Sequence, residues 1–313
     1  MLDKKNIHFI VGMSRAGTTW LSQCLNQHSE VVVFGETCFF GRNNIAKEGY
    51  NREDINFLIE KLKNNDLDNT VICEKDGGVF QRIKKTLDDV EVGEGLSKKE
   101  IFYSICNDIA SSENKTTAIE KTPHHVNSID EIRRLFPDSK LIIMRRDAYS
   151  FMRSYKFIGD IKEDNLKKEF KNVFHPLGNL LVYRKYLKSI EVVSKLKNTL
   201  LIDFLELKNN PEKITKRVQE FLDLKSTENI TLPRINSSFN KKKVKTLALE
   251  DLVWLKLFGM GNSFALKWSQ LIKAPFVFLV SILKLPIWAI NVYRQISKVS
   301  TVHPLSYITN LLK

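Results

Sequence analysis

The sequence predicts an α/β fold in which helices flank a central parallel sheet, followed by a helical C-terminal tail that is basic and apolar. Apolar, β-prone runs alternate with amphipathic helical runs over residues 7–225. A glycine-containing loop joins the first strand to the first helix, and the run from residue 140 leads directly into another helix. With 313 residues, of which 43% are hydrophobic, the chain can bury a full core of this class.

Each element follows from a local pattern. Strands are predicted at 7–11, 31–34, 70–73, 117–120 and from 140. Helices are predicted at 20–26, 52–63, 79–88, 97–111, 129 onward, 176–197 and 211 onward. Capping boxes, in which a serine is followed three residues later by a glutamate, open the helices at Ser97 and Ser128. The alternation of strands and helices favours parallel strand pairing.

The loop after the first strand has the composition of a phosphate-binding loop. It reads Gly12-Met13-Ser14-Arg15-Ala16-Gly17-Thr18-Thr19. Loop amides and the positive end of the following helix dipole would bind an anion there, with Arg15 and the hydroxyls adding contacts. ATP and GTP loops need a lysine where Thr18 stands, so a phosphosulfate fits better than a triphosphate. A glycine turn that only joins strand to helix is the structural alternative.

A second anion contact is predicted after the strand that begins at residue 140. Parallel sheets bind ligands at the carboxyl ends of their strands, so Arg146 would emerge at the same edge as the first loop. Ser154 follows eight residues later, about 11 Å along a helix, within reach of the same phosphate as the arginine. The alternative is that Arg146 caps the helix or forms a surface ion pair.

Together these segments resemble the PAPS-dependent sulfotransferases of bacterial and carbohydrate-acting type. Residues 15–21 are similar to the 5′-phosphosulfate loop of that family, and 146–154 to its 3′-phosphate element. Glu120-Lys121-Thr122-Pro123 and the stretch 200–224 are similar to two further family motifs. The resemblance implies a P-loop-type three-layer fold. It also implies 3′-phosphoadenosine 5′-phosphosulfate (PAPS) as co-substrate, bound by Ser14, Arg15, Ala16, Gly17, Thr18, Thr19, Arg146, Ser154 and Lys241.

Glu36 is the first candidate for the catalytic base. It directly follows the second predicted strand, so its carboxylate would face the same crevice as Arg15 and could take a proton from an acceptor hydroxyl. The surrounding segment also resembles the base-bearing element of glycan and protein-tyrosine sulfotransferases. His124 is the second candidate. A surface glutamate and a packing histidine are the corresponding structural alternatives.

Two basic residues complete the predicted chemistry. Arg15 would stabilise the oxygen that leaves with the nucleotide, and Lys121 would lie near the sulfonyl group or an acidic acceptor, or form an ordinary strand-end salt bridge. Lys241 lies in a basic run that would either cover the 3′-phosphate or remain solvated. No metal is expected, because the four cysteines have no metal-ligand spacing.

The C-terminal tail differs from the rest of the chain. From 236 to 313 it has eleven basic and two acidic residues, +9 of the total charge of +13. The apolar stretch from Ala274 to Tyr293 is interrupted by Lys284 and Pro286, which favours a pair of helices lying in a membrane interface. A dimer interface or a core-packing helix is the alternative. The predicted division is a catalytic domain at 1–235, a basic loop and helix at 236–261 and a helical tail at 262–313.

The expected reaction is transfer of a sulfo group to a hydroxyl or amine, on a glycan, a glycolipid or another hydroxyl-bearing acceptor. The alternatives are a membrane-attached nucleotide-binding protein without turnover and a P-loop kinase. The first residues show no charged-then-apolar leader pattern, so a cytoplasmic location is expected, with attachment to the inner face of an anionic membrane. No nucleic-acid partner is expected, and a homodimer is compatible with the sequence.

Overall fold

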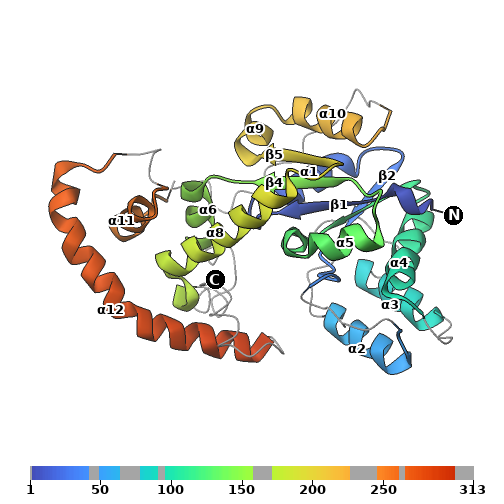
Figure 1. Cartoon of the computed structure of the whole chain (residues 1–313), viewed down its shortest axis with the longest axis horizontal. Helices are drawn as coiled ribbons and strands as arrows, with labels where there is room; N and C mark the ends of the chain where they lie inside the picture. The colour runs from blue at the N-terminus through green and yellow to red at the C-terminus, as the bar shows by residue number, and fades with distance from the viewer. Residues whose placement is uncertain are drawn as a thin grey trace. The chain divides into compact units, whose positions relative to one another are not determined.

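A computed structural model describes residues 2–41, 49–63, 78–90, 96–157, 171–225, 245–260 and 265–299. The chain divides into two compact units, which are described in turn (Figure 1). The first comprises Met1–Arg145 and Ser189–Ile235, and the second Arg146–Lys188 and Asn236–Lys313. The predicted strand at 70–73 and Lys241 lie outside the described residues.

The first unit contains a parallel sheet, as the sequence predicts. Its strands are β1 (Ile7–Gly12), β2 (Val31–Phe34), β3 (Thr117–Lys121), β4 (Leu141–Arg145) and β5 (Thr199–Asp203). Their order in the sheet is β2-β3-β1-β4-β5, and every neighbouring pair is parallel. All carboxyl ends therefore lie along one edge, which is where parallel sheets place their ligands.

The first unit also contains helices. They are η1 (Lys4–Asn6), α1 (Thr18–Leu25), α2 (Arg52–Lys63), α3 (Val79–Asp89), α4 (Lys98–Ser112), η4 (Pro123–Ser128), α5 (Ile129–Leu135), α9 (Phe204–Asn209) and α10 (Pro211–Phe221). The capping box of Ser97 forms as predicted. Ser128 begins α5 without a side-chain cap, because the 3₁₀ helix η4 runs directly into α5. The short helix α9 was not predicted.

The sheet is covered on both faces, with α9 and α10 on one side and α4 and α5 on the other (Figure 1). On the α4 side an aromatic cluster forms the core. Phe9 of β1 stacks on Phe102 of α4 with ring centroids 5.7 Å apart, and Phe136 packs 5.5 Å from Phe102. Phe39 and Phe40 join the same cluster, 5.0 and 4.9 Å from Phe102. Residues 39 and 40 are thereby fixed against the sheet.

The described part of the second unit is helical. It contains α6 (Ala148–Lys156), most of α8 (Pro176–Val193), α11 (Leu249–Leu257) and α12 (Trp268–Val299). Phe151 packs against Tyr183 and Tyr186 between α6 and α8. The helix predicted at 176–197 thus begins as expected and ends four residues earlier.

The predicted pair of helices in the tail was wrong, because α12 is one helix of 32 residues. Pro275 and Pro286 lie inside it, and both are exposed on its outer side. A proline removes one backbone hydrogen bond and pushes away the preceding turn, which bends a helix without necessarily ending it. Figure 1 shows α12 curving along its length. The prolines on the outer side therefore accompany a bend rather than a break.

Candidate active site at the carboxyl edge of the sheet

The loop between β1 and α1 requires glycine at both ends. Gly12 has φ +124°, and a Cβ there would lie 2.2 Å from the carbonyl oxygen of Met144 on the neighbouring strand. Gly17 has φ +85°, and its Cβ would meet the ring of Phe204 at 2.7 Å. Both conditions exclude L side chains. The predicted loop therefore has a shape fixed by its glycines, and α1 begins at Thr18.

The loop has the composition of an anion site. Arg15 adopts a left-handed backbone conformation with φ 66°, and Ser14, Arg15 and Thr19 are partly exposed, whereas Ala16 and Thr18 are buried. The first turn of an α-helix has N–H groups without intrahelical acceptors, and its dipole favours negative charge. The residues present therefore fit a phosphate or sulfate group at the start of α1.

Glu36 and Lys121 form an ion pair at the carboxyl ends of β2 and β3. The Lys121 ammonium donates to Glu36 Oε1 at 2.6 Å. Lys121 is fully buried, whereas the Glu36 side chain is 30% exposed. Gly35, with φ +144°, allows this approach, since a Cβ there would lie 2.2 Å from the Lys121 carbonyl oxygen. The structure thus brings together two predicted catalytic residues.

A buried polar network holds the loop that carries Glu36. The Glu120 carboxylate accepts hydrogen bonds from the Thr37 amide at 3.1 Å, the Thr37 hydroxyl at 2.8 Å and the Thr122 hydroxyl at 2.5 Å. The Thr122 hydroxyl in turn accepts from the Cys38 amide at 3.2 Å. Thr37 is therefore tied to Glu120 directly and Cys38 through Thr122, so the segment just after Glu36 is held to the end of β3.

His125 completes the network. Its Nε2 accepts from the Phe40 amide at 3.1 Å, so the ring proton is on Nδ1, which lies 2.9 Å from Glu120 Oε2. That contact is close without being a well-aligned hydrogen bond. Burial by itself raises the pKa of Glu120, but the His125 ring and the bonds from Thr122 and Thr37 outweigh it and hold that pKa below its usual value.

His124, the second candidate base, points to the loop rather than to Glu36. It is exposed, and its Nε2 lies 3.5 Å from the Ser14 hydroxyl oxygen. The neighbouring His125 is fully buried. The two adjacent histidines therefore differ: His124 lies beside the phosphate-binding loop, and His125 supports the loop of Glu36.

The two arginines at the end of β4 also differ. Arg145 forms a bidentate pair with Asp203 of β5, with Nε–Oδ1 and Nη2–Oδ2 distances of 2.8 and 2.7 Å. Arg146 begins the second unit, and its carbonyl accepts from the Tyr183 hydroxyl at 3.0 Å. Ser154, two turns along α6, is buried.

Sequence reasoning missed the Arg145–Asp203 pair and the support from Glu120, Thr37, Thr122 and His125. The available signal in the sequence was the run of polar residues at the end of β3 and just after it, since a charged group that becomes buried requires partners. Among the described residues, no group of three or more His, Cys, Asp or Glu side chains gathers as a metal site.

Comparison with known proteins identifies the family. A family model described as "Sulfotransferase family" matches residues 8–228, more than half of the chain. A search of curated proteins found no match.

Solved structures give distant likenesses. The sulfotransferase domain of the olefin synthase of Synechococcus PCC 7002 is 16% identical, with 86% of this chain and 93% of that chain covered and a TM-score of 0.48. The sulfotransferase domain from the curacin biosynthetic pathway is 16% identical (87% and 96% covered, TM-score 0.42). A sulfotransferase from Alicyclobacillus acidocaldarius is 15% identical (90% and 95% covered, TM-score 0.41). The family assignment rests on the sequence match.

That match begins in β1 and ends just after α10, so it includes the loop of Arg15, the ion pair of Glu36 with Lys121 and the whole parallel sheet. The chain belongs to the sulfotransferase family.

Proposed function

We propose that this sulfotransferase moves a sulfo group from PAPS to an acceptor hydroxyl or amine, with Glu36 as the general base. The observation that carries the proposal is the Glu36–Lys121 ion pair, 2.6 Å long, at the carboxyl edge of the sheet that also bears the phosphate-binding loop. Glu36 follows β2 and the loop follows β1, and β3, which ends in Lys121, lies between these two strands, so all three groups lie at the same edge of the sheet.

The donor fits the loop chemically. PAPS supplies the sulfo group when it is bound. The loop amides, Thr18 and Thr19 would hold its 5′-phosphosulfate, and Arg15 would stabilise the negative charge that develops on the leaving oxygen. The sequence assigns the 3′-phosphate to Arg146 and Ser154, with Lys241 as a further contact. These three assignments remain predictions.

Lys121 would prepare Glu36 for proton transfer. The ammonium binds Oε1 and would hold that oxygen in place, and Oε2 would take the proton of the acceptor. The acceptor oxygen would attack sulfur in line as its proton moves to Glu36. Lys121 is fully buried, which agrees with a positioning role better than with direct contact to a large acceptor.

The acceptor class follows from the sequence resemblance alone, which favours a glycan or a glycolipid. The two alternative functions make different demands. A nucleotide-binding protein without turnover would bind the product nucleotide and transfer nothing. A P-loop kinase would bind ATP with Mg²⁺, although Thr18 occupies the position of the lysine that such loops use.

The test is a transfer assay with the full-length chain. The protein is incubated with sulfur-35-labelled PAPS and separate glycan, glycolipid and simple hydroxyl acceptors, and labelled product is counted. We expect label on at least one acceptor class and none with a Glu36→Gln control. Calorimetry with adenosine 3′,5′-bisphosphate and with ATP–Mg²⁺ is run in parallel.

Each outcome distinguishes the proposed reaction from one of its alternatives. Tight binding of the bisphosphate without transfer to any acceptor would support the nucleotide-binding protein. Preference for ATP–Mg²⁺ would support the kinase. Transfer that survives Glu36→Gln and disappears in His124→Ala would move the base to His124.

A further inference from the structure

Helix α12 has two chemically different faces. Its inner face is held by polar contacts within the second unit, and its outer face is apolar and exposed. Over Trp268–Arg294 it is long and apolar enough to cross a membrane by length and composition, and Ser281 is the one buried residue of that stretch. An exposed apolar surface of this extent on a folded unit needs a partner.

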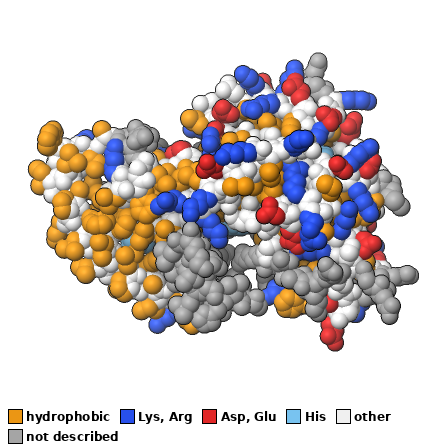
Figure 2. Space-filling model, viewed as in Figure 1, with side chains coloured by type: hydrophobic (Ala, Val, Ile, Leu, Met, Phe, Trp, Pro, Cys, Tyr) orange, Lys and Arg blue, Asp and Glu red, His pale blue; other side chains and the backbone are white. Residues whose placement is uncertain are grey.

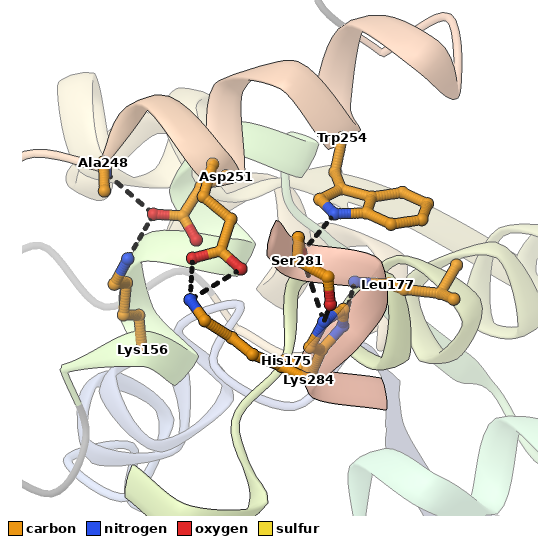
Figure 3. Close-up of polar contacts among 9 residues, drawn as sticks. Lys156, His175, Leu177, Ala248, Asp251, Trp254, Ser281 and Lys284 are labelled. Carbon is orange, nitrogen blue, oxygen red and sulfur yellow. Dashed lines mark hydrogen bonds and ion pairs between the residues drawn. The ribbon is translucent and has the colours of Figure 1, made fainter. Parts of the chain in front are cut away.

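The inner face is anchored at the middle of the helix. Ser281 is fully buried, and its hydroxyl accepts from the Trp254 indole at 2.9 Å (Figure 3). His175 Nδ1 accepts from the Leu177 amide, so its proton is on Nε2, which lies 3.1 Å from the Ser281 carbonyl oxygen. Lys284 pairs with Glu250 of α11 at 3.1 Å.

The anchoring continues toward the C-terminal end of α12. The Trp288 indole donates to the Val173 carbonyl at 2.9 Å, and its ring lies on Gly178, where a Cβ would come within 2.3 Å. The Asn291 amide donates to the Asn172 carbonyl at 3.2 Å. These contacts hold α12 to α8, to α11 and to the residues just before α8.

The outer face presents large apolar side chains at helical spacing. They are Trp268, Leu271, Ile272, Phe276, Leu279, Ile282, Leu283, Ile287, Ile290 and Tyr293. Figure 2 shows hydrophobic side chains gathered on the side where Figure 1 draws α12. Trp268 and Tyr293 lie at the two ends of this face, the positions that aromatic side chains favour at a lipid–water boundary.

The charged residues of α12 and of its start all have one sign. From residue 252 to residue 313 the sequence contains no Asp or Glu, whereas Lys267, Lys273, Lys284 and Arg294 lie along the described part of α12 and its start. An apolar face without charged neighbours could bind many kinds of partner. Lys284 is paired with Glu250 on the inner side, whereas Lys267, Lys273 and Arg294 are exposed. An apolar face bordered by these three cations is complementary to an anionic lipid surface.

We propose that α12 is an in-plane membrane helix, with its outer face among the lipid acyl chains and its inner face bound to its own folded unit. A transmembrane orientation conflicts with the anchors. It would carry the Lys284–Glu250 pair and the adjacent Lys156–Asp251 pair toward the hydrocarbon, where charged groups are costly. Lying in the plane keeps these pairs on the aqueous side.

Vesicle cosedimentation of the full-length chain tests the proposal. The triple variant Ile272→Asn, Phe276→Asn, Ile287→Asn changes three exposed residues of the outer face. Its matched control changes three exposed apolar residues elsewhere, Phe57→Asn, Val192→Asn and Leu205→Asn. We expect the wild type and the control to bind phosphatidylserine-containing vesicles and the α12 variant to bind at least about tenfold more weakly, because interfacial binding follows buried apolar area.

A second experiment varies the salt concentration and the charge of the lipid. Binding should weaken as salt rises or as phosphatidylcholine replaces phosphatidylserine. Equal binding of the two triple variants, or no binding by the wild type, would overturn the proposal. A dimer that the α12 variant dissociates, without vesicle binding by the wild type, would assign the face to a second copy.

Topology is read with single cysteines introduced at the two ends of the helix, Ser269→Cys and Arg294→Cys. A membrane-impermeant maleimide added outside sealed vesicles should label both when α12 lies in the plane, with the wild-type chain as background. Protection of one end by the vesicle would show a span and overturn the in-plane assignment. Sulfo transfer to a soluble acceptor should be unchanged in the α12 variant, so this test is independent of the proposed reaction.

Discussion

Each unit contains a buried histidine that holds a neighbouring segment in place, His125 in the first unit and His175 in the second. In the first unit His125 accepts from the Phe40 amide and faces the Glu120 carboxylate, so it fixes a short loop. In the second unit His175 binds the Ser281 carbonyl and fixes the middle of a long helix. His125 faces a buried carboxylate, whereas His175 binds a backbone carbonyl and is itself neutral, since burial lowers the pKa of His175.

The two regions need different degrees of positional precision. A general base must be held to within a fraction of an ångström, and charge-assisted hydrogen bonds supply that precision. A helix that presents an apolar surface needs only to be held by one side, and α12 is held there by neutral hydrogen bonds and by the Lys284–Glu250 ion pair. If the two regions act independently, a change in one should leave the property of the other unchanged.

The largest expected effect is on turnover. Glu36→Gln keeps the shape of the side chain but cannot accept a proton, so sulfo transfer should fall by about 10²–10⁴-fold, the usual contribution of a general base. Vesicle binding should not change. Lys121→Met is the matched control, because it also breaks the ion pair while the carboxylate remains. Equal losses in the two variants would mean that the pair is structural and that Glu36 is not the base.

The next effect is on stability. Glu120→Gln removes the buried charge and should lower the free energy of unfolding at pH 7 by about 1.5–3 kcal/mol, the range for hydrogen bonds to charged groups. The pKa of Glu120 is lower in the folded protein than its ordinary 4.5, so its stabilisation is present above pH 4.5 and is lost as the pH falls below it. Denaturant unfolding at several pH values should show this loss in the wild type and less of it in the variant. Identical pH profiles would contradict the assignment.

Arg146→Ala tests whether the second unit also serves the nucleotide. If Arg146 binds the 3′-phosphate, affinity for adenosine 3′,5′-bisphosphate should fall about tenfold or more, since a charge-assisted contact is worth about 1.5–3 kcal/mol. Affinity for adenosine 5′-monophosphate, which lacks that phosphate, should hardly change. Calorimetry with both nucleotides measures the ratio, and equal weakening of both would refute the 3′-phosphate role.

The smallest effect is expected from Ser281→Ala. The variant loses the hydroxyl that accepts from Trp254 and lies 3.2 Å from His175 Nε2, whereas His175 keeps the backbone carbonyl as a partner. Unfolding free energy should fall by about 1 kcal/mol, and transfer to a soluble acceptor should stay at the wild-type rate. A loss of turnover larger than the loss of stability would show that the two networks are coupled.

The sequence predicts the strand ends well because their signal is local. The loop at 12–19, the strand at 31–34 and the capping box of Ser97 each depend on neighbouring residues, and all were confirmed. The Glu36–Lys121 pair depends on β2 lying beside β3, which is a property of the sheet order. Local sequence patterns do not specify the order of the strands in the sheet, so they could not predict that these two side chains lie together.

The prediction for the tail was wrong because it relied on a local signal where distant contacts decide the structure. Two prolines in an apolar segment predict a break, and the local rule is sound for an isolated helix. In the folded unit the contacts of Ser281 and Trp288 lie on either side of Pro286 and hold the helix to its neighbours on both sides of that residue. Long-range contacts thus overrode a local helix-breaking signal.

Arg145 has an electrostatic consequence for the carboxyl edge. Asp203 and Glu36 are carboxylates at strand ends of the first unit, and each has its own cation, Arg145 and Lys121 respectively. Unpaired, they would create a negative potential that repels a polyanionic donor before any contact is made. With their charges compensated within the protein, the helix dipole and Arg15 would favour an approaching anion at that edge. In the proposed reaction, the Arg145–Asp203 pair would thereby raise the rate at which the donor arrives.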